Sequence, residues 1–414
     1  MKRVLMIAYH FPPLAGSSGI QRTLRFVRHL PEFGWEPIVL TTDARAYERT
    51  SGDLEAEVPP TVRVSRAFAL DTARHLSVFG RYPAFLARPD RWMTWRFAGT
   101  AEGRRLIRES APALLWSTFP IATAHVIGEA LHRSSGLPWV ADFRDPMAQD
   151  GYPEDAKLWQ SYAQVEARTV RAARFSVFTA PGAARLYRHR YPNVAKRFVV
   201  LENGFDEASF AGLSPGATRE PLERGAVSLL HSGIVYRSER DPTALFGAVR
   251  KLRDAGRLAQ RTLRLRFRAS ENDAMLHELA RRFDVADALQ CLPPVGYQVA
   301  LDEMSRADAL LVLQAANCNE QIPAKLYEYL RAGRPILGLT DPRGDTAAVL
   351  REAGLDTIAR LDAPDEIATL LERMLAASAG GALPLPRPDA VARASRRERT
   401  RALAALFDDA VAAR

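Results

Sequence analysis

A lysine and two glutamates stand at a spacing that suits the binding of a nucleoside diphosphate. Glu320, Lys325 and Glu328 follow a continuous apolar run, Ala309–Leu313, which is typical of a buried strand. Pro323 suits the first turn of a helix, so we expect Glu320 in the loop at the carboxyl end of the strand, where open α/β sheets bind ligands. An ammonium near a helix start can hold a diphosphate, and a carboxylate one helical turn away can bind two ribose hydroxyls. For either residue alone, a capped amphipathic helix with a solvated Glu–Lys pair is the favoured interpretation.

A second candidate is the loop Pro12–Gly19, which joins the apolar run Val4–Ala8 to a stretch with helical spacing. Gly16 and Gly19 would let the backbone approach a ligand, and the N-terminus of a helix attracts anions. The two glycines lie three residues apart, so they do not form the G-x-G-x-x-G fingerprint of dinucleotide binding. This disfavours a nicotinamide-dependent oxidoreductase. An ordinary tight strand–helix turn is the alternative interpretation.

Charged residues also follow a predicted strand in the first half of the chain. Asp142, Arg144 and Asp145 come directly at the end of the apolar run Trp139–Ala141. One of the carboxylates could orient an acceptor hydroxyl or assist its deprotonation. The alternative is a buried ion pair that braces the loop.

The pattern of possible metal ligands predicts that no metal is used. No Asp-x-Asp pair follows a predicted strand, and no His or Cys cluster has the spacing of metal ligands. Arginines, a lysine and helix N-termini would then neutralise a leaving diphosphate. His10 and His231 each stand beside a strand end, where they could face a ligand, although such histidines are more often structural.

The apolar runs that must position these residues predict a doubly wound α/β fold. They alternate with stretches of helical spacing, which is the pattern of strands buried on both faces of a parallel sheet. The predicted strands are Val4–Ala8, Pro37–Thr41, Leu114–Trp116, Trp139–Ala141, Phe175–Phe178, Phe198–Leu201, Val227–Leu230, Leu263–Phe267, Ala309–Leu313 and Pro335–Leu339. Because 414 residues are many for one core, we expect two Rossmann-like domains divided near Asn203–Asp206. A linker at Ser378–Pro388 and a last helix at Val391–Ala412 complete the prediction.

The segment Glu320–Pro335 resembles the Glu–seven residues–Glu motif of family-4-type glycosyltransferases, which have the GT-B fold of two facing Rossmann-like domains. Its version, Pro-x-Lys-x-x-Glu-Tyr-Leu-x-x-Gly-Arg-Pro, is similar to that of a bacterial subgroup that builds cell-surface polysaccharides. The resemblance implies that Glu320 lies by the sugar of the donor and that Glu328 holds the nucleotide ribose. It also implies a metal-independent reaction that retains the anomeric configuration.

Other segments resemble the same family, and among them Pro89–Trp92 and Ser117–Pro120 are similar to the bacterial subgroup. Asn203–Asp206 resembles its interdomain hinge, and Leu137–Pro146 resembles a strand end and loop that face the cleft from the first domain. The expected domains are an acceptor domain at 1–204, a nucleotide-sugar donor domain at 205–385, and a C-terminal helix at 386–414 that packs back on the first domain.

One motif departs from the pattern of this family. Many members have Gly-Arg-Leu and then Lys-Gly after the first strand of the second domain, whereas this chain has Gly233-Ile234. Arg237 or Arg240 could supply the missing charge, and a solvated loop charge is the alternative for each. The expected donor-binding residues are Gly16, Gly19, Gly233, Arg237, Arg240, Pro294, Val295, Ile322, Lys325, Leu326 and Glu328. The expected catalytic residues are Glu320, Asp142, Arg144 and Asp145.

The predicted activity is transfer of a sugar from a UDP- or GDP-linked donor to a hydroxyl of a lipid-linked or polysaccharide acceptor, with no further cofactor. A nucleotide-sugar epimerase of the same fold is the alternative within this fold, and it would consume a nucleotide-sugar without an acceptor. A basic nucleic-acid-binding protein is the alternative from another class.

The net charge of +9 resides in the first half of the chain. Residues 1–204 carry 28 Lys and Arg against 19 Asp and Glu, whereas residues 205–414 carry 29 of each. Nucleic-acid binding needs base-stacking aromatic residues interleaved with cations, and only Phe79–Arg108 comes near that pattern. The excess therefore fits an anionic acceptor or membrane surface better than a nucleic acid.

The segment Phe79–Arg108 mixes aromatic residues with arginines, which suits the headgroup region of an anionic bilayer. The alternative is an ordinary helix with aromatic core residues and solvated arginines. The sequence contains no run of ~20 apolar residues that could span a membrane. The run Val4–Ala8 is too short for a signal peptide, and two cysteines make no disulfide scaffold. We expect a cytoplasmic protein, peripheral to the inner face of the membrane if it contacts one.

Overall fold

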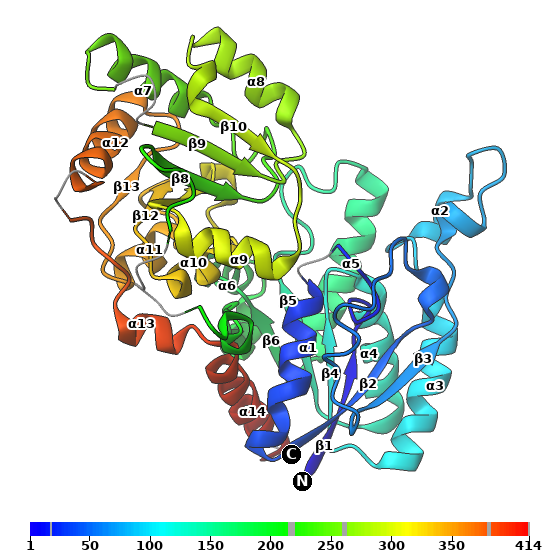
Figure 1. Cartoon of the computed structure of the whole chain (residues 1–414). Helices are drawn as coiled ribbons and strands as arrows, with labels where there is room; N and C mark the ends of the chain where they lie inside the picture. Colours follow the sequence, from blue (N-terminus) through cyan, green and yellow to red (C-terminus); the bar gives the residue numbers. More distant parts are fainter. Residues whose placement is uncertain (17–18, 214–219, 259–262, 379–381, 413–414) are drawn as a thin grey trace. The chain divides into compact units, whose positions relative to one another are not determined.

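The computed structural model of the chain describes residues 1–16, 19–213, 220–258, 263–378 and 382–412. Two compact units make up the chain (Figure 1). The first combines Met1–Asn203 with Arg396–Arg414, and the second is Gly204–Ser395. Each unit has its own parallel sheet.

The first unit is built on a seven-stranded sheet in the order β3-β2-β1-β4-β5-β6-β7. Its strands are β1 (Lys2–Ile7), β2 (Trp35–Thr42), β3 (Arg63–Ala67), β4 (Leu114–Thr118), β5 (Trp139–Arg144), β6 (Phe175–Phe178) and β7 (Phe198–Val200). Its helices are α1 (Gly19–His29), α2 (Thr72–His75), α3 (Trp95–Ser110), α4 (Ala122–Ser135), α5 (Ala156–Ala172), α6 (Pro181–Arg190) and α14 (Arg396–Ala412). The strand order reverses at β1, which pairs with both β2 and β4, and ligands of open α/β sheets bind at such a switch point.

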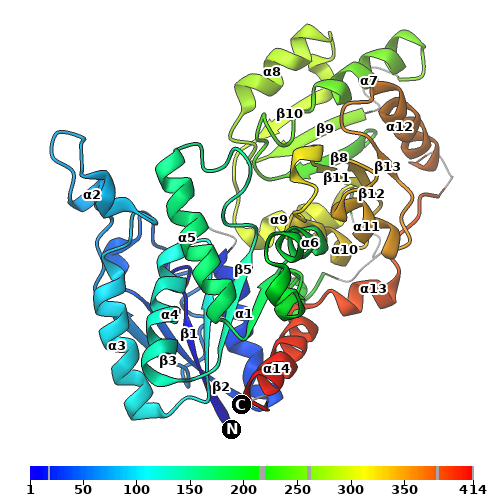
Figure 2. The ribbon, with the colours of Figure 1, turned by 180° about the vertical axis from the view of Figure 1, so that it is seen from behind.

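Helices cover both faces of this sheet, and this explains the unbroken apolar run of β1. Helices α3, α4 and α5 lie side by side on one face (Figure 2), and α1 and α14 pack together on the other (Figure 1). Residues 4–7 are consequently fully buried. Helix α14 completes the core from the other end of the sequence, because Phe407 packs 5.3 Å from Trp35 between ring centroids. The indole Nε1 of Trp35 also donates a hydrogen bond of 3.1 Å to Asp408.

The second unit is built on a six-stranded parallel sheet in the order β10-β9-β8-β11-β12-β13. Its strands are β8 (Val227–Ser232), β9 (Leu263–Arg268), β10 (Leu289–Leu292), β11 (Ala309–Leu313), β12 (Ile336–Leu339) and β13 (Ile358–Ala359). Its helices are α7 (Thr243–Asp254), α8 (Asp273–Arg282), α9 (Tyr297–Arg306), α10 (Lys325–Ala332), α11 (Asp345–Glu352), α12 (Pro364–Ser378) and α13 (Pro388–Arg393). Its switch point lies between β8 and β11, and α10 follows β11 in the chain.

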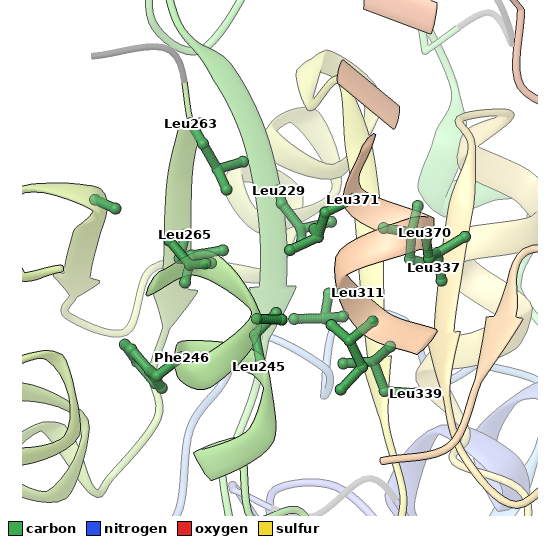
Figure 3. Close-up of a cluster of buried hydrophobic side chains, with 14 of the residues drawn as sticks. Leu229, Leu245, Phe246, Leu263, Leu265, Leu311, Leu337, Leu339, Leu370 and Leu371 are labelled. Carbon is green, nitrogen blue, oxygen red and sulfur yellow. The ribbon is translucent and has the colours of Figure 1, made fainter. Parts of the chain in front are cut away.

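The core of the second unit lies between the sheet and helices α7 and α12. Figure 3 shows Leu229 and Leu311 from neighbouring strands beside Leu245 of α7 and Leu371 of α12. All four side chains are at most 1 % exposed. This packing fixes the carboxyl ends of β8 and β11, which carry the candidate donor residues.

The predicted doubly wound α/β fold is confirmed, and each predicted strand forms. The sequence failed to predict β3, β10 and β13. All three lie at the edges of their sheets, where burial is incomplete. Strand β3, for example, has three polar residues among its five, and β13 has only two residues, so neither produces a long apolar run.

The C-terminal segment differs from its prediction. The expected last helix, Val391–Ala412, is two helices, because the backbone of Ser395 forms a bridge with Phe205 instead of continuing the helix. Arg387 donates hydrogen bonds to the carbonyls of Ala353 (from its backbone N–H) and Glu352 (from its guanidinium), which attaches α13 to the second unit. The predicted segment 386–414 is therefore divided, with residues 386–395 in the second unit. Part of the predicted linker, residues 379–381, lies outside the described residues.

No helix within the described ranges is long and apolar enough to cross a membrane.

Candidate functional site

Helix α10 begins with Lys325 at the carboxyl edge of the second sheet, next to the end of β8. Gly233, the residue directly after β8, has a φ of +126°, which favours glycine. A Cβ at this position would collide with Nζ of Lys325. At the Gly233–Lys325 contact, backbone that carries no side chain therefore lies next to a half-buried ammonium. Two hydrogen bonds hold this strand end, from the Ser232 amide to the Tyr329 hydroxyl (2.9 Å) and from the Gly233 amide to the Arg268 carbonyl (2.8 Å).

The surroundings of Lys325 make its charge costly in the absence of an anion. Burial lowers the pKa of Lys325 to about 7, the positive charge of Arg240 adds to this, and Glu328 offsets part of it. Burial and the charge of Lys325 likewise lower the pKa of His231 to about 3, so its imidazole is neutral. Its Nδ1 lies 2.9 Å from the Leu311 carbonyl. His231 thus fits the structural role, since it ties β8 to β11.

The two arginines considered for the phosphate charge occupy different places. Arg237 is exposed. Arg240 is half-buried, donates a hydrogen bond of 2.6 Å to the Ile234 carbonyl, and lies over the ring of Tyr236 at 5.2 Å. Only Arg240 of these two acts on the pKa of Lys325. The structure therefore brings Arg240, rather than Arg237, together with Lys325.

Glu328 lies one turn after Lys325 on α10 and is half-buried. The hydroxyl of Tyr297, the first residue of α9, donates a hydrogen bond of 2.7 Å to its Oε1. Pro294 and Val295 are exposed in the loop that joins β10 to α9. The sequence analysis missed Tyr297, because its contact with α10 depends on how two helices pack.

Glu320 lies in an exposed turn between β11 and α10, as the position of Pro323 predicts. Ile322 and Leu326, in contrast, are buried beneath this turn and α10. The turn is fixed by Gln314, a buried residue directly after β11, whose Nε2 donates hydrogen bonds of 2.9 Å to the carbonyls of Cys318 and Gln321. Gln314 is a positioning residue that the sequence analysis missed, because its amide acts on residues that flank Glu320 and not on a ligand.

A cavity of about 700 Å³ lies elsewhere in the second unit, at the carboxyl ends of β11, β12 and β13 and the N-termini of α7 and α12. Gln314, Phe283, Asp341 and Arg360 are among its lining residues. Gly233, Lys325, Glu328 and the other predicted donor residues do not line it. Size alone therefore does not identify the donor site in this unit.

In the first unit, Asp142 on β5 is fully buried and paired with Arg22 of α1. Arg22 donates from Nε to Oδ2 (2.9 Å) and from Nη2 to Oδ1 (3.0 Å), and Thr118 also donates to Oδ2 (3.1 Å). The same guanidinium donates to the carbonyl of Leu201, 3.0 Å away. This geometry matches the bracing ion pair and not a carboxylate that contacts an acceptor.

Arg144 and His10 lie together beside the start of α1. A Cβ on Gly19, the first residue of α1, would collide with Nδ1 of His10 and Nη1 of Arg144. Burial lowers the pKa of the Arg144 guanidinium, and its buried Nε has no hydrogen-bond partner within the described part of the chain. Burial and Arg144 together lower the pKa of His10 to about 3, so His10 is neutral. The result is a half-buried cation at a helix N-terminus, which favours an anion.

The remaining first-unit candidates are more open. Asp145 is half-buried and accepts a hydrogen bond of 3.3 Å from the Thr179 hydroxyl, so part of its carboxylate is accessible. Gly16 is exposed at a φ of +80°, with no atom within 4 Å of a Cβ built there. Between them, Arg144, Asp145 and Gly19 form the first-unit candidate site at the carboxyl ends of β1 and β5.

No group of three or more His, Cys, Asp or Glu among the residues that the structure describes is placed to hold a metal ion. The Lys325 ammonium lies beside Gly233, and both Arg240 and Glu328 are close enough to act on its pKa.

The sequence matches no model of a protein family and no curated protein. The structure is similar to solved structures over the whole chain. Sucrose-phosphate synthase from Thermosynechococcus elongatus is 14 % identical with a TM-score of 0.60, and the match covers 100 % of this chain and 97 % of that one. HepE from Anabaena in complex with UDP is 12 % identical with a TM-score of 0.62, and the shares are again 100 % and 97 %.

A third similar structure is the lipopolysaccharide outer core galactosyltransferase WaaB in its apo form. It is 11 % identical with a TM-score of 0.59, and the match covers 99 % of each chain. Likeness at this level of identity concerns the fold, and its extent over both units shows that the chain has the GT-B fold.

Proposed function

We propose that this chain is a glycosyltransferase that moves a sugar from a nucleotide-sugar, bound by the second unit, to a hydroxyl of an acceptor bound by the first. The observation that carries the proposal is the Lys325 ammonium against Gly233 at the end of β8, with Glu328 one helical turn away. HepE from Anabaena, which has a similar structure, binds UDP, and this supports a nucleotide-linked donor.

The donor diphosphate would bind at the Gly233–Lys325 contact. Lys325 and Arg240 would supply two positive charges to a group that gains negative charge as the sugar departs, and this stabilises the transition state. Arg240 is the better candidate than Arg237 because it lies close enough to Lys325 to lower its pKa. With these two cations in place the leaving group can be stabilised without a metal ion, so we propose a metal-independent reaction.

The nucleoside would be held by the elements on either side of Glu328. Its carboxylate can accept hydrogen bonds from two ribose hydroxyls, and the Tyr297 hydroxyl already orients it. The exposed loop with Pro294 and Val295 would contact the base. Ile322 and Leu326 are buried, so their role would be to support α10 from below.

Glu320 would lie beside the transferring sugar. Its exposed position leaves the carboxylate free to stabilise positive charge that develops on the sugar ring, and Gln314 fixes the turn that carries it. We propose that the reaction proceeds through an oxocarbenium-like transition state with retention of configuration, as the resemblance of Glu320–Pro335 implies.

The first unit would present the acceptor. Arg144, at the start of α1 with Gly19, would bind an anionic group, and Asp145 would orient the reacting hydroxyl. Asp142 would serve only as the brace for β5 and α1. An anionic, lipid-linked or polysaccharide intermediate fits this half-buried cation and the positive excess of residues 1–204.

The first test is ligand binding to the whole chain. UDP or GDP should raise the melting temperature, since a ligand at 100 times its dissociation constant stabilises the folded state by about 2.7 kcal/mol. A chain that responds to neither nucleotide nor to their common sugar conjugates would not be a nucleotide-sugar enzyme.

The second test separates Glu320 from nucleotide binding. Glu320→Gln should lower transfer by about 100-fold or more while the nucleotide dissociation constant changes less than about threefold, because this carboxylate would act on the sugar in the transition state. Glu352→Gln, an exposed glutamate at the end of α11, is the matched control and should have normal turnover. Unchanged turnover in Glu320→Gln would remove this residue from the mechanism. Consumption of the nucleotide-sugar without any acceptor would favour an epimerase instead.

A further inference from the structure

A short hairpin after α2 holds an aromatic side chain away from the rest of the first unit. Val78 and Arg81 exchange two backbone hydrogen bonds, of 2.8 Å and 3.0 Å, around the turn residues Phe79 and Gly80. Both turn residues have positive φ, +51° and +75°, a conformation that a bulky L-residue such as phenylalanine adopts only at an energetic cost. Phe79 is nevertheless fully exposed at the tip. Figures 1 and 2 both show this segment beside α2, extending outward from the first sheet.

Further apolar side chains surround Phe79. Val78 is 67 % exposed, Phe85 is 65 % exposed, and Tyr82 is 36 % exposed. We call residues 78–85 the aromatic tip. Folding buries none of these side chains completely, so packing in the first unit does not explain their composition.

The charged side chains of residues 72–89 have one sign, although Nη2 of Arg88 lies 4.0 Å from the carboxylate of Asp155. Residues 72–89 contain Arg74, Arg81 and Arg88, together with His75, and no aspartate or glutamate. Arg74 and Arg81 are exposed. Exposed aromatic rings beside exposed arginines such as Arg74 and Arg81 match the interface of a bilayer that carries anionic lipids.

The rest of the predicted segment Phe79–Arg108 is different. Trp95 is completely buried, and Arg105 of α3 is paired with both Glu102 and Glu109. This helix fits the alternative of core aromatics and surface charges, although Phe97 remains 67 % exposed. The structure thus restricts the membrane-like character to the aromatic tip.

We propose that the aromatic tip docks the first unit on an anionic lipid bilayer, with Phe79 and Phe85 in the headgroup region and Arg81 beside lipid phosphates. This inference rests on the proposed function and deepens it, because it identifies the surface at which the first unit would bind a lipid-linked acceptor. A protein partner for the tip would be a different outcome and would overturn it.

A cavity next to the tip supports a link to the acceptor. It has a volume of about 390 Å³. Its lining includes Tyr82, Arg88, Trp92 and Tyr162. Asp90 also lines it, and burial raises the pKa of this carboxyl to about 6. Because Tyr82 belongs to both surfaces, a docked tip would place the cavity at the membrane.

The test uses the full chain and vesicles of phosphatidylcholine with or without phosphatidylglycerol. Wild type should sediment with phosphatidylglycerol-containing vesicles at low salt and much less with phosphatidylcholine alone. The double variant Phe79→Ala/Phe85→Ala should weaken that binding by about tenfold or more, because it removes the two rings that would insert into the headgroup region. Arg81→Gln should weaken it less and reduce its salt dependence.

Phe97→Ala is the matched control, since it removes a ring that is about as exposed as that of Phe85 and that follows an arginine on α3. It should bind vesicles as wild type does. The melting temperature and its shift with UDP or GDP are measured for every variant. If wild type responds to nucleotide but does not bind vesicles, the docking surface is overturned and the proposed function stands. If wild type binds vesicles but does not respond to nucleotide, the proposed function is overturned and the docking surface stands. Equal losses in the Phe97 and Phe79/Phe85 variants, or none in the latter, would also overturn the inference.

Discussion

Lys325 combines burial with a neighbouring cation, and this should make nucleotide binding depend on pH. Its pKa is lowered to about 7 by burial and Arg240, with Glu328 acting in the opposite direction. A bound diphosphate would favour the charged ammonium and raise this pKa again.

Below pH 7 Lys325 is mostly charged and the chain is ready to bind, whereas above pH 7 the charged fraction falls by up to about tenfold per pH unit, and the apparent affinity falls with it. Calorimetric titration with UDP or GDP at pH 6.5, 7.5 and 8.5 should therefore show weaker binding at higher pH and proton uptake on binding.

Lys325→Arg is the informative comparison for this pH dependence. Arginine stays charged at all these pH values, so the slope should flatten even if the absolute affinity changes. A slope that persists in Lys325→Arg would assign the pH dependence to another group.

Arg22 and Asp142 illustrate the opposite case, a charge that is satisfied within the protein. Arg22→Met would leave the fully buried Asp142 carboxylate without its counter-ion, and we expect a loss of about 3–5 kcal/mol in the stability of the first unit. Asp145→Asn, which alters a half-buried carboxylate, should change the stability by only about 0.5 kcal/mol. Calorimetric melting of the two variants would measure both, and equal effects would contradict the assignment of Asp142 as a brace.

At the scale of elements, the junction between β8 and α10 depends on a glycine. Gly233→Ala would force a Cβ against Lys325 and impose a φ of +126° on an L-residue. We expect a loss of about 1–2 kcal/mol in stability and at least about a tenfold loss in nucleotide affinity, because the ammonium must move.

Gly225→Ala separates strain from displacement of the lysine. Gly225 also has a positive φ, +79°, but a Cβ there would meet nothing within 4 Å. This variant should lose stability and keep its nucleotide affinity. If both glycine variants bind nucleotide normally, the diphosphate does not bind at the Gly233–Lys325 contact.

The elements that the sequence predicted and those that it missed differ in their burial. Strands such as β1 and β11 are covered on both faces, so burial selects continuous apolar residues and the run is visible in the sequence. The edge strands β3, β10 and β13 are stabilised mainly by pairing with one neighbour, and pairing leaves little trace in side-chain pattern. The same reason hid Gln314 and Tyr297, whose hydrogen bonds join segments that only folding brings together.

The motif residues themselves were predictable to a different degree. The spacing of Lys325 and Glu328 follows from helix geometry, so their common face could be expected. Nothing local distinguishes Arg237 from Arg240, since the carbonyl of Ile234 selects one of them through the path of the loop. Asp142 likewise needed a partner, Arg22, that is distant in the sequence.

At the scale of the whole molecule, α14 belongs to the first unit although 192 residues of the second unit separate it from Asn203. Its Phe407 is fully buried against Trp35. Phe407→Ala should therefore lower the stability of the first unit by about 3–5 kcal/mol through the cavity it leaves.

Calorimetry can test this placement, because the second unit should melt as in wild type. Asp409→Ala, an exposed neighbour on α14, is the control and should leave both transitions in place. A shift in the second unit's transition alone would contradict the assignment of α14 to the first core.

The first unit contains both ends of the chain, and this has a consequence for its synthesis on the ribosome. The second unit is one uninterrupted stretch, so it can finish folding as soon as Ser395 has emerged, whereas the first unit, although translated earlier, lacks part of its hydrophobic core until α14 follows. The half of the protein that is made first is thus completed last. A transcript that is truncated anywhere before α14 would yield a first unit with an open apolar face, which chaperones and proteases recognise, so only a chain translated through this helix completes the core of the first unit.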